Sequence, residues 1–252
     1  MAAGKQRLDI ELVRQGIVSS RSQAENWIKL GDVTVNGKAV TKPGFFVSPD
    51  AVISLRAQEQ YVSRAGLKLA SVASLLGIDF KEKIVLDVGS STGGFTDYSL
   101  RHGAKKVFAV DVGTDQLHPS LRTDNRIELH EKTDIRDVTL AGAPKEGRVV
   151  LDETPDVVVI DVSFISLRDI LPHVATLCGD ATQIAAMVKP QFEAGKHQVN
   201  KGVIKNDSVR RQILHDFESW AKQSFIISDK RDSEVAGAKG NRERFYLLRR
   251  LK

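Results

Sequence analysis

The stretch Lys83-Ile84-Val85-Leu86-Asp87-Val88-Gly89-Ser90-Ser91-Thr92-Gly93-Gly94-Phe95-Thr96 has the pattern of a strand, a tight turn and the start of a helix. Its apolar run is typical of a buried strand. The three glycines that follow allow the backbone to turn sharply and to approach a ligand closely. The stretch therefore predicts a cofactor-binding turn between strand and helix, the alternative being a turn that only connects the two.

The spacing of the glycines narrows the choice of cofactor. It departs from the G-x-G-x-x-G of dinucleotide-binding proteins and lacks the Lys-Ser/Thr pair of a phosphate-binding loop, which disfavours NAD and ATP. A second apolar run ends at Asp111, an acid suited to a ribose diol. These features favour S-adenosylmethionine, which has a nucleoside but no phosphate. The residues expected at its methionine end are Gly89, Ser91, Gly93, Gly94 and Phe95.

Length and composition indicate one large domain and one small domain, since the 252 residues are 41% apolar. No apolar run is long enough to span a bilayer and the N-terminus lacks a signal-peptide pattern. We therefore expect a cytoplasmic protein without stable membrane insertion. The single cysteine, Cys178, excludes an intrachain disulfide and a Cys-rich metal site, and we expect no metal.

The net charge of +5 is distributed unevenly along the chain. Residues 197–252 carry 13 Lys/Arg against 7 Asp/Glu, whereas acids exceed bases in residues 61–196. Basic ends around an acidic middle favour a polyanionic partner, although a solvated charged surface has the same pattern. Nothing in the pattern indicates an oligomeric state.

Residues 7–56 have the pattern of a compact α+β module. Ser20 and Gln23 form a capping box that opens a helix ending at Gly31. Asn36-Gly37 between two β-rich runs is a strong hairpin signal. The basic residues of the module are scattered along a face without an aromatic stacking platform, so we expect it to bind RNA mainly through phosphates. The basic candidates are Arg7, Arg14, Arg21, Lys29, Lys38 and Lys42.

This module resembles the small RNA-binding domain shared by a ribosomal small-subunit protein and many pseudouridine synthases. The resemblance rests on Arg7-Leu8-Asp9, Ser20-Arg21-Ser22-x-Ala24 and Gly31-x-Val33-x-Val35-Asn36-Gly37. A dimerisation or packing module is the alternative.

After a linker, strands and helices alternate and end in a hairpin of strands near 225–228 and 245–248, which predicts a mainly parallel sheet with an antiparallel edge. Asp161 and Lys189 follow buried strands, where open α/β sheets bind ligands. Glu243 precedes an antiparallel strand and so belongs to the same edge. Asp134 follows a third short strand and suits an adenine contact. A structural ion pair between Lys189 and Asp161 is the alternative to a catalytic role.

The second domain resembles the FtsJ-like ribose 2′-O-methyltransferases, whose Lys-Asp-Lys-Glu tetrad is matched by Lys68, Asp161, Lys189 and Glu243. Together with the N-terminal module, the chain is similar to the TlyA family of haemolysin-named rRNA 2′-O-methyltransferases. One departure is Arg242-Glu243-Arg244, because relatives usually have an apolar or aromatic residue after the glutamate. The other local matches are Ser63-Arg64-Ala65-Gly66-x-Lys68-Leu69, Asp87-Val88-Gly89-Ser90-Ser91, Asp161-Val162-Ser163-Phe164-Ile165-Ser166 and Lys189-Pro190-Gln191-Phe192.

The resemblance implies an RNA-binding domain over residues 1–56, a linker over 57–61 and a Rossmann-like methyltransferase domain with a seven-stranded sheet over 62–252. It also implies S-adenosylmethionine-dependent methylation of a ribose in ribosomal RNA, with cytidine the expected nucleotide and rRNA or ribosomal subunits the partners. A noncatalytic ribosome-assembly factor is one alternative. A pore-forming haemolysin is another, and it would need a membrane segment that the sequence lacks.

A ribose hydroxyl is a poor nucleophile, so a base must take its proton while the oxygen is aligned with the methyl donor. Lys189 is the expected base. Asp161 and Glu243 are expected to position the two amines, Asp161 also facing the cofactor's sulfonium end, and Lys68 is expected to stabilise the developing alkoxide.

Overall fold

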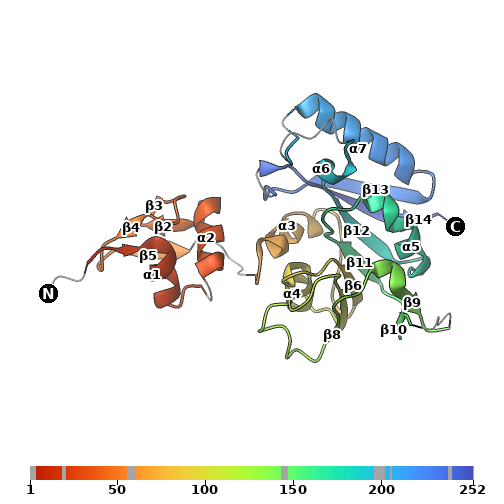
Figure 1. Cartoon of the computed structure of the whole chain (residues 1–252), viewed down its shortest axis with the longest axis horizontal. Helices are drawn as coiled ribbons and strands as arrows, with labels where there is room; N and C mark the ends of the chain where they lie inside the picture. The colour runs from red at the N-terminus through yellow and green to blue at the C-terminus, as the bar shows by residue number, and fades with distance from the viewer. Residues whose placement is uncertain are drawn as a thin grey trace. The chain divides into compact units, whose positions relative to one another are not determined.

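The computed structural model describes residues 4–18, 21–55, 61–142, 147–195, 202–204, 206–237 and 240–251. The chain forms two compact units, Met1–Val62 and Ser63–Lys252 (Figure 1). The expected linker, residues 57–61, adjoins this division, and most of it lies outside the described residues.

The first unit combines two helices with short strands. Its elements are β1 (Gln6–Arg7), α1 (Leu8–Arg14), α2 (Arg21–Leu30), β2 (Val33–Val35), β3 (Lys38–Ala39), β4 (Phe46–Val47) and β5 (Ile53–Leu55). Leu8 and Leu12 of α1 and Ile28 of α2 are fully buried and contribute to the core of this unit. The small α+β domain predicted from the sequence is confirmed.

Asn36 and Gly37 connect β2 to β3 and have φ angles of 50° and 78°. A two-residue type I′ hairpin turn requires positive φ at both central positions, which explains this residue pair. β3, β2 and β5 form one sheet, whereas β1 and β4 form a separate antiparallel ribbon. α2 ends before Gly31, whose φ is 82°, and its expected cap Ser20 lies outside the described residues.

The second unit is built on a seven-stranded sheet of order β13-β14-β12-β11-β6-β7-β8. Its strands are β6 (Ile84–Val88), β7 (Lys106–Val110), β8 (Ile127–His130), β9 (Val138–Leu140), β10 (Val149–Leu151), β11 (Val157–Ile160), β12 (Gln183–Val188), β13 (Phe225–Asp232) and β14 (Arg244–Arg250). Its helices are α3 (Arg64–Ala73), α4 (Gly94–Arg101), α5 (Leu171–Thr176), α6 (Pro190–Glu193) and α7 (Asp207–Ala221), with 3₁₀ turns at Ile135–Asp137 and Leu167–Asp169.

The strands from β12 to β8 are parallel, and β14 is antiparallel to both of its neighbours. The mainly parallel sheet is thus confirmed, with its antiparallel strand one position inside the edge strand β13. β9 and β10 form a separate parallel pair, which the sequence pattern did not indicate.

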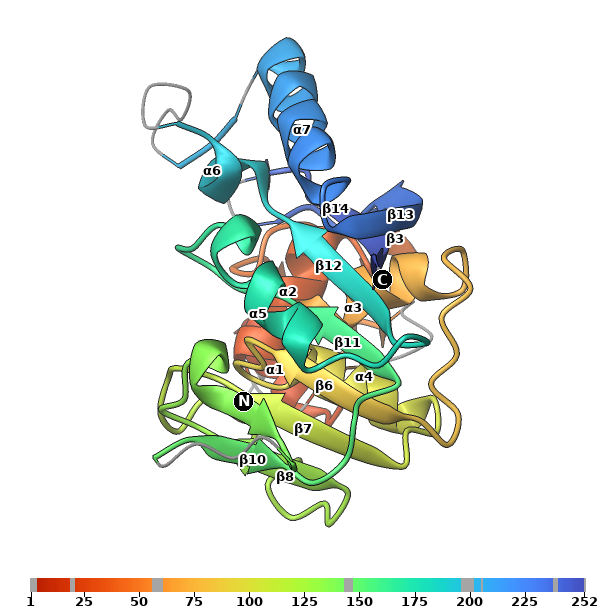
Figure 2. The ribbon, with the colours of Figure 1, turned by 90° about the vertical axis from the view of Figure 1, so that its right-hand side faces the viewer.

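Helices cover both faces of the sheet. α5 and α7 pack on the face formed by Leu86, Ile160 and Val188. α4 contacts β6 and β7, packs against α3, and lies with it on the opposite side of the sheet from α5 (Figure 2). Cover on both faces explains why β11 is an uninterrupted run of buried aliphatic residues. Cys178 is buried in this core, as the sequence pattern predicts.

Candidate active site

The turn glycine Gly89 and three charged residues lie at one edge of the seven-stranded sheet. Gly89, Asp161 and Lys189 each follow a parallel strand, β6, β11 and β12 respectively. β14 pairs antiparallel with β12 and begins opposite its end. Glu243, one residue before β14, therefore lies at the same edge, as the sequence pattern predicts.

Lys189 is held by the loop that follows β11. Its Nζ lies 2.6 Å from Asp161 Oδ1 and donates a hydrogen bond of 2.8 Å to Ser163 Oγ. The side chains of Lys189 and Asp161 are only 10% and 16% exposed, so water screens this ion pair less than a pair on the surface. The lysine amine is thus fixed at the sheet edge.

Lys68 is presented by α3 and forms an ion pair with Glu243 at 2.5 Å, with side chains 11% and 2% exposed. Glu243 and Lys189 each lie one residue beyond Val188↔Arg244, the last pair of the β12–β14 ladder. The structure therefore places all four residues of the expected tetrad at one sheet edge, as two ion pairs.

The unusual arginines beside Glu243 point to another partner. Arg244 donates to Asp232 at 2.6 Å, and Arg242 lies 3.6 Å from the same carboxylate. Asp232 therefore satisfies both cations. Glu243 remains paired with Lys68, so the departure from the family pattern leaves its inward orientation intact.

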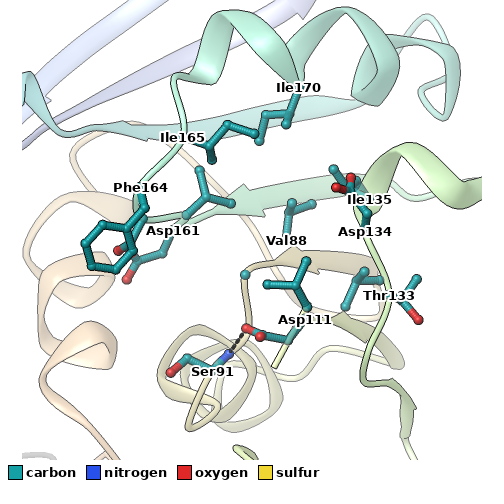
Figure 3. A pocket seen from close by; sticks show the side chains of 15 residues that line it. Val88, Ser91, Asp111, Thr133, Asp134, Ile135, Asp161, Phe164, Ile165 and Ile170 are labelled. Atoms are coloured by element: carbon teal, nitrogen blue, oxygen red, sulfur yellow. Dashed lines mark hydrogen bonds between the residues drawn. The ribbon is translucent and has the colours of Figure 1, made fainter. Parts of the chain in front are cut away.

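A cleft of about 360 Å³ adjoins the tetrad (Figure 3). Asp161 and Phe164 lie at one end of it, and Thr133, Asp134 and Ile135 lie at the other. None of the described residues that line the cleft is basic. This volume suits a nucleoside, and a lining with acids but no cations does not suit a phosphate.

Asp111 lines this cleft beneath the glycine turn (Figure 3). Its Oδ2 accepts from the Ser91 backbone N–H at 2.7 Å, and its Oδ1 accepts from that of Gly113 at 2.6 Å. A carboxylate has about four acceptor positions, so oxygen lone pairs remain for a ligand hydroxyl. Asp111 therefore shapes the turn and can also bind a ribose.

Asp134, at the far end, is bonded to the Arg136 guanidinium through both oxygens, at 2.9 and 2.6 Å. These bonds hold the pKa of Asp134 below its usual value. An ionised acid thus faces the cleft where the sequence predicted an adenine contact.

The residues expected at the methionine end of the cofactor do not all line the cleft. Gly89 and Ser91 line the cleft, whereas Gly93, Gly94 and Phe95 do not. A Cβ on Gly94 would lie 2.8 Å from the backbone nitrogen of Gly66, so this glycine allows α4 to pack closely on α3. Phe95 is buried against Phe245.

Asp87, the acid of the β6 strand, is fully buried below the turn. Thr96 donates a hydrogen bond of 2.7 Å to it, and burial raises its pKa to about 7. Asp87 therefore ties β6 to α4 rather than facing the cleft.

The comparisons with known proteins agree with this geometry. Residues 61–250 match the model of the FtsJ-like methyltransferases, and residues 6–53 match the S4 domain. The chain belongs to the FtsJ-like methyltransferase family. Its two compact units correspond to these matches, with the S4 domain in the first and the FtsJ-like domain in the second.

Relatives resemble the chain over nearly its whole length. It is 41% identical to hemolysin A of Brachyspira hyodysenteriae, over 94% of this chain and 97% of that protein. It is 37% identical to the 16S/23S rRNA (cytidine-2′-O)-methyltransferase TlyA of Mycobacterium tuberculosis, over 98% and 91%. A solved structure described as a hemolysin from Streptococcus thermophilus has 36% identity and a TM-score of 0.73, covering 98% of this chain and 89% of that one.

Metal-binding groups and membrane-spanning helices are both absent from the part of the chain that the structure describes. No group of three or more His, Cys, Asp or Glu side chains there could hold a metal ion. No helix there combines the length and apolar character that crossing a membrane requires.

In the S4 domain, two of the expected RNA contacts converge on one carboxylate. Arg7 and Arg21 both donate to the buried Asp9, at 2.9 and 2.8 Å. Arg14 instead pairs with Glu11. Lys38 and Lys42 are exposed, and the side chain of Lys29 lies outside the described residues.

The site contains two polar or aromatic groups that the sequence reasoning did not single out. Ser163 binds Lys189, and Phe164 is 92% exposed with a φ of 66°. The Phe164 ring lies 5.2 Å from that of Phe192. A bulky residue with positive φ and an exposed ring is costly, which makes this position a candidate for a functional role. The sequence signal was their place in the stretch Asp161-Val162-Ser163-Phe164, which matches the FtsJ-like pattern without indicating a role for either residue.

Glu193 is a third such residue and joins the two loops that carry Asp161 and Lys189. Its carboxylate accepts from Ser166 Oγ at 2.6 Å and from the Leu167 backbone N–H at 2.7 Å. Burial raises its pKa. This contact fixes the spacing of the FtsJ-like site across two strands.

Proposed function

We propose that this protein transfers a methyl group from S-adenosylmethionine to a ribose 2′-hydroxyl of ribosomal RNA. The observation that carries the proposal is the presence of two ion pairs, Lys68–Glu243 and Lys189–Asp161, at the sheet edge beside an acid-lined cleft whose described lining has no basic residue. The name of the Mycobacterium tuberculosis relative supports cytidine in 16S or 23S rRNA as the target. Action on rRNA also favours a cytoplasmic location.

The described cleft fits S-adenosylmethionine, which when bound supplies an electrophilic methyl group. Asp111 would bind the ribose hydroxyls, and Asp134 would lie near the adenine. Gly89 and Ser91 would contact the methionine end, with Asp161 close to the sulfonium end. Gly93, Gly94 and Phe95 would act by holding α4 in place beneath the turn.

The chain's own residues perform the proton transfer and the alignment. Lys189 accepts the proton of the ribose hydroxyl through Nζ. Asp161 and Ser163 orient that amine, and Lys68, held by Glu243, stabilises the negative charge that develops on the oxygen. Holding the reactants in line can lower the barrier by about 7–11 kcal/mol. Phe164 offers a ring on which a base beside the site can stack.

Mapping of 2′-O-methylation on 16S and 23S rRNA, from cells with and without this protein, tests the proposed function. We expect at least one methylated cytidine to disappear when the protein is absent and to return when it is supplied again. Identical maps in both strains would contradict the proposal. Loss of methylation at a base atom instead of at a ribose would contradict the proposed 2′-O-methylation but would support rRNA as the substrate.

Asp111→Ala is expected to weaken S-adenosylmethionine binding by about 10- to 100-fold, because a hydrogen bond to a charged group contributes about 1.5–3 kcal/mol. Isothermal titration calorimetry measures this directly. Asp216→Ala, at an exposed position of α7, is the matched control and should bind normally. Unchanged affinity in Asp111→Ala would remove Asp111 from the cofactor site.

A further inference from the structure

The β1–β4 ribbon of the S4 domain exposes an aromatic ring. Phe46 is 59% exposed and its neighbour Phe45 is 43% exposed. The other face of β4 is closed, because Val47 is 2% exposed. Single exposed apolar side chains are common, but two consecutive phenylalanines form a larger apolar surface than solubility favours.

The ladder register places a cation beside this ring. Arg7 of β1 pairs directly with Phe46 of β4, so the two side chains lie on the same side of the ribbon. Asp9 holds the Arg7 guanidinium at both ends, through Nε and Nη2 at 2.9 Å each. The Arg7 guanidinium also lies close to the chain before β4, since a Cβ on Gly44 would be 3.6 Å from Arg7 Cζ. Arg7 is therefore fixed next to Phe46 rather than freely mobile.

Two further cations belong to segments that contact Arg7's partner or precede β4. Arg21 shares the Asp9 carboxylate and is 55% exposed. Lys42, exposed in the turn before β4, accepts at its backbone oxygen from the Phe45 N–H at 3.0 Å. Asp9 itself is buried, so the cations face outward while their counterion does not. This part of the S4 domain thus combines an exposed ring with exposed basic side chains.

We propose that Phe46 and Arg7 form a stacking site for an unpaired base of RNA. A base has an apolar face that fits a phenyl ring, and its phosphate matches Arg7 and Lys42. Phosphates alone would need the cations but not the ring, and base–aromatic stacking contributes substantially to single-strand binding. The proposal rests on RNA as the partner of the S4 domain and adds a contact to unpaired bases. It differs from the expectation that the module binds RNA without an aromatic stacking platform.

Binding of the full chain to a short unpaired RNA oligonucleotide, and to the duplex of the same length, tests the proposal. Phe46→Ala should weaken single-strand binding about tenfold. The dependence of the Phe46→Ala affinity on salt concentration should equal that of the wild type, because no phosphate contact is lost. Duplex binding should not change. Phe46→Tyr should restore single-strand binding, whereas Phe46→Leu should not, since a leucine is apolar without a ring.

Leu75→Ala, at an exposed apolar position of the FtsJ-like domain, is the control and should behave as wild type. Equal binding by Phe46→Ala and wild type would overturn the stacking site. Full binding of the single-stranded RNA by Phe46→Leu would show that an apolar side chain without a ring is sufficient, and would also overturn the stacking site. Failure of the wild type to bind any RNA would instead contradict the proposed partner.

Discussion

Lys189→Ala is expected to reduce methyl transfer by about 10²- to 10⁴-fold, the range that a positioned general base contributes. Lys189 lies at the carboxyl end of β12, with its amine fixed by Asp161 and Ser163 beside the cleft. Lys189 is not itself part of the cleft lining, and the lining residues that it binds through polar contacts are Asp161 and Ser163. Cofactor affinity and the fold should therefore be largely retained.

Lys189→Arg separates a base from a residue that only positions the substrate. Arginine keeps the positive charge and can still pair with Asp161, but it does not accept a proton at physiological pH. We expect this variant to be as inactive as Lys189→Ala. Single-turnover rates across pH measure the step itself, and Lys222→Ala on the exposed end of α7 serves as the control. Near-normal turnover by Lys189→Arg would exclude proton abstraction by this residue.

Much of the catalytic edge could be predicted because it follows from strand direction. Asp161 and Lys189 end runs of buried residues, and parallel strands bring such ends together. Predicting the position of Glu243 required one further inference, namely that β14 runs antiparallel to β12. Strand positions and directions follow from the hydrophobic periodicity and from the order of the elements, and both can be read from a single sequence.

The pairing within the edge could not be predicted in this way. Lys68 is on a helix, and its contact with Glu243 depends on how α3 packs against the sheet. Gly94 illustrates the same limit. A glycine pattern does not distinguish approach to a ligand from approach to another helix, and here the neighbour is Gly66. Phe46 likewise belongs to a two-residue strand that has no periodic signal.

The length of β13 could not be predicted from its side chains, because backbone pairing with β14 determines it. The apolar pattern predicted a strand near residues 225–228, but β13 continues to Asp232 through a polar stretch. Pairing with β14 supplies its hydrogen bonds, and the register shifts between Ile227 and Asp229. This extension has a consequence for the site, because it places Asp232 where it binds the two arginines that flank Glu243.

Glu243→Leu is expected to destabilise the FtsJ-like domain by about 3–5 kcal/mol, because it leaves the nearly buried Lys68 amine without its partner. Lys68→Met should have an effect of similar size, since Glu243 is then the unpaired charge. Thermal or urea unfolding of each variant measures the loss. The exposed pair Arg250–Asp180 is the control, and Asp180→Ala should change stability by less than about 1 kcal/mol.

The double variant Lys68→Met/Glu243→Leu decides whether this ion pair serves structure or reaction. Apolar side chains of similar volume can replace a buried ion pair at little cost, so most of the lost stability should return. Transfer should not return, because no cation remains to stabilise the developing alkoxide. We expect single-turnover rates at least about 100-fold below wild type, as when one electrostatic donor is removed. A stable double variant with near-normal transfer would show that Lys68 and Glu243 only hold the fold together.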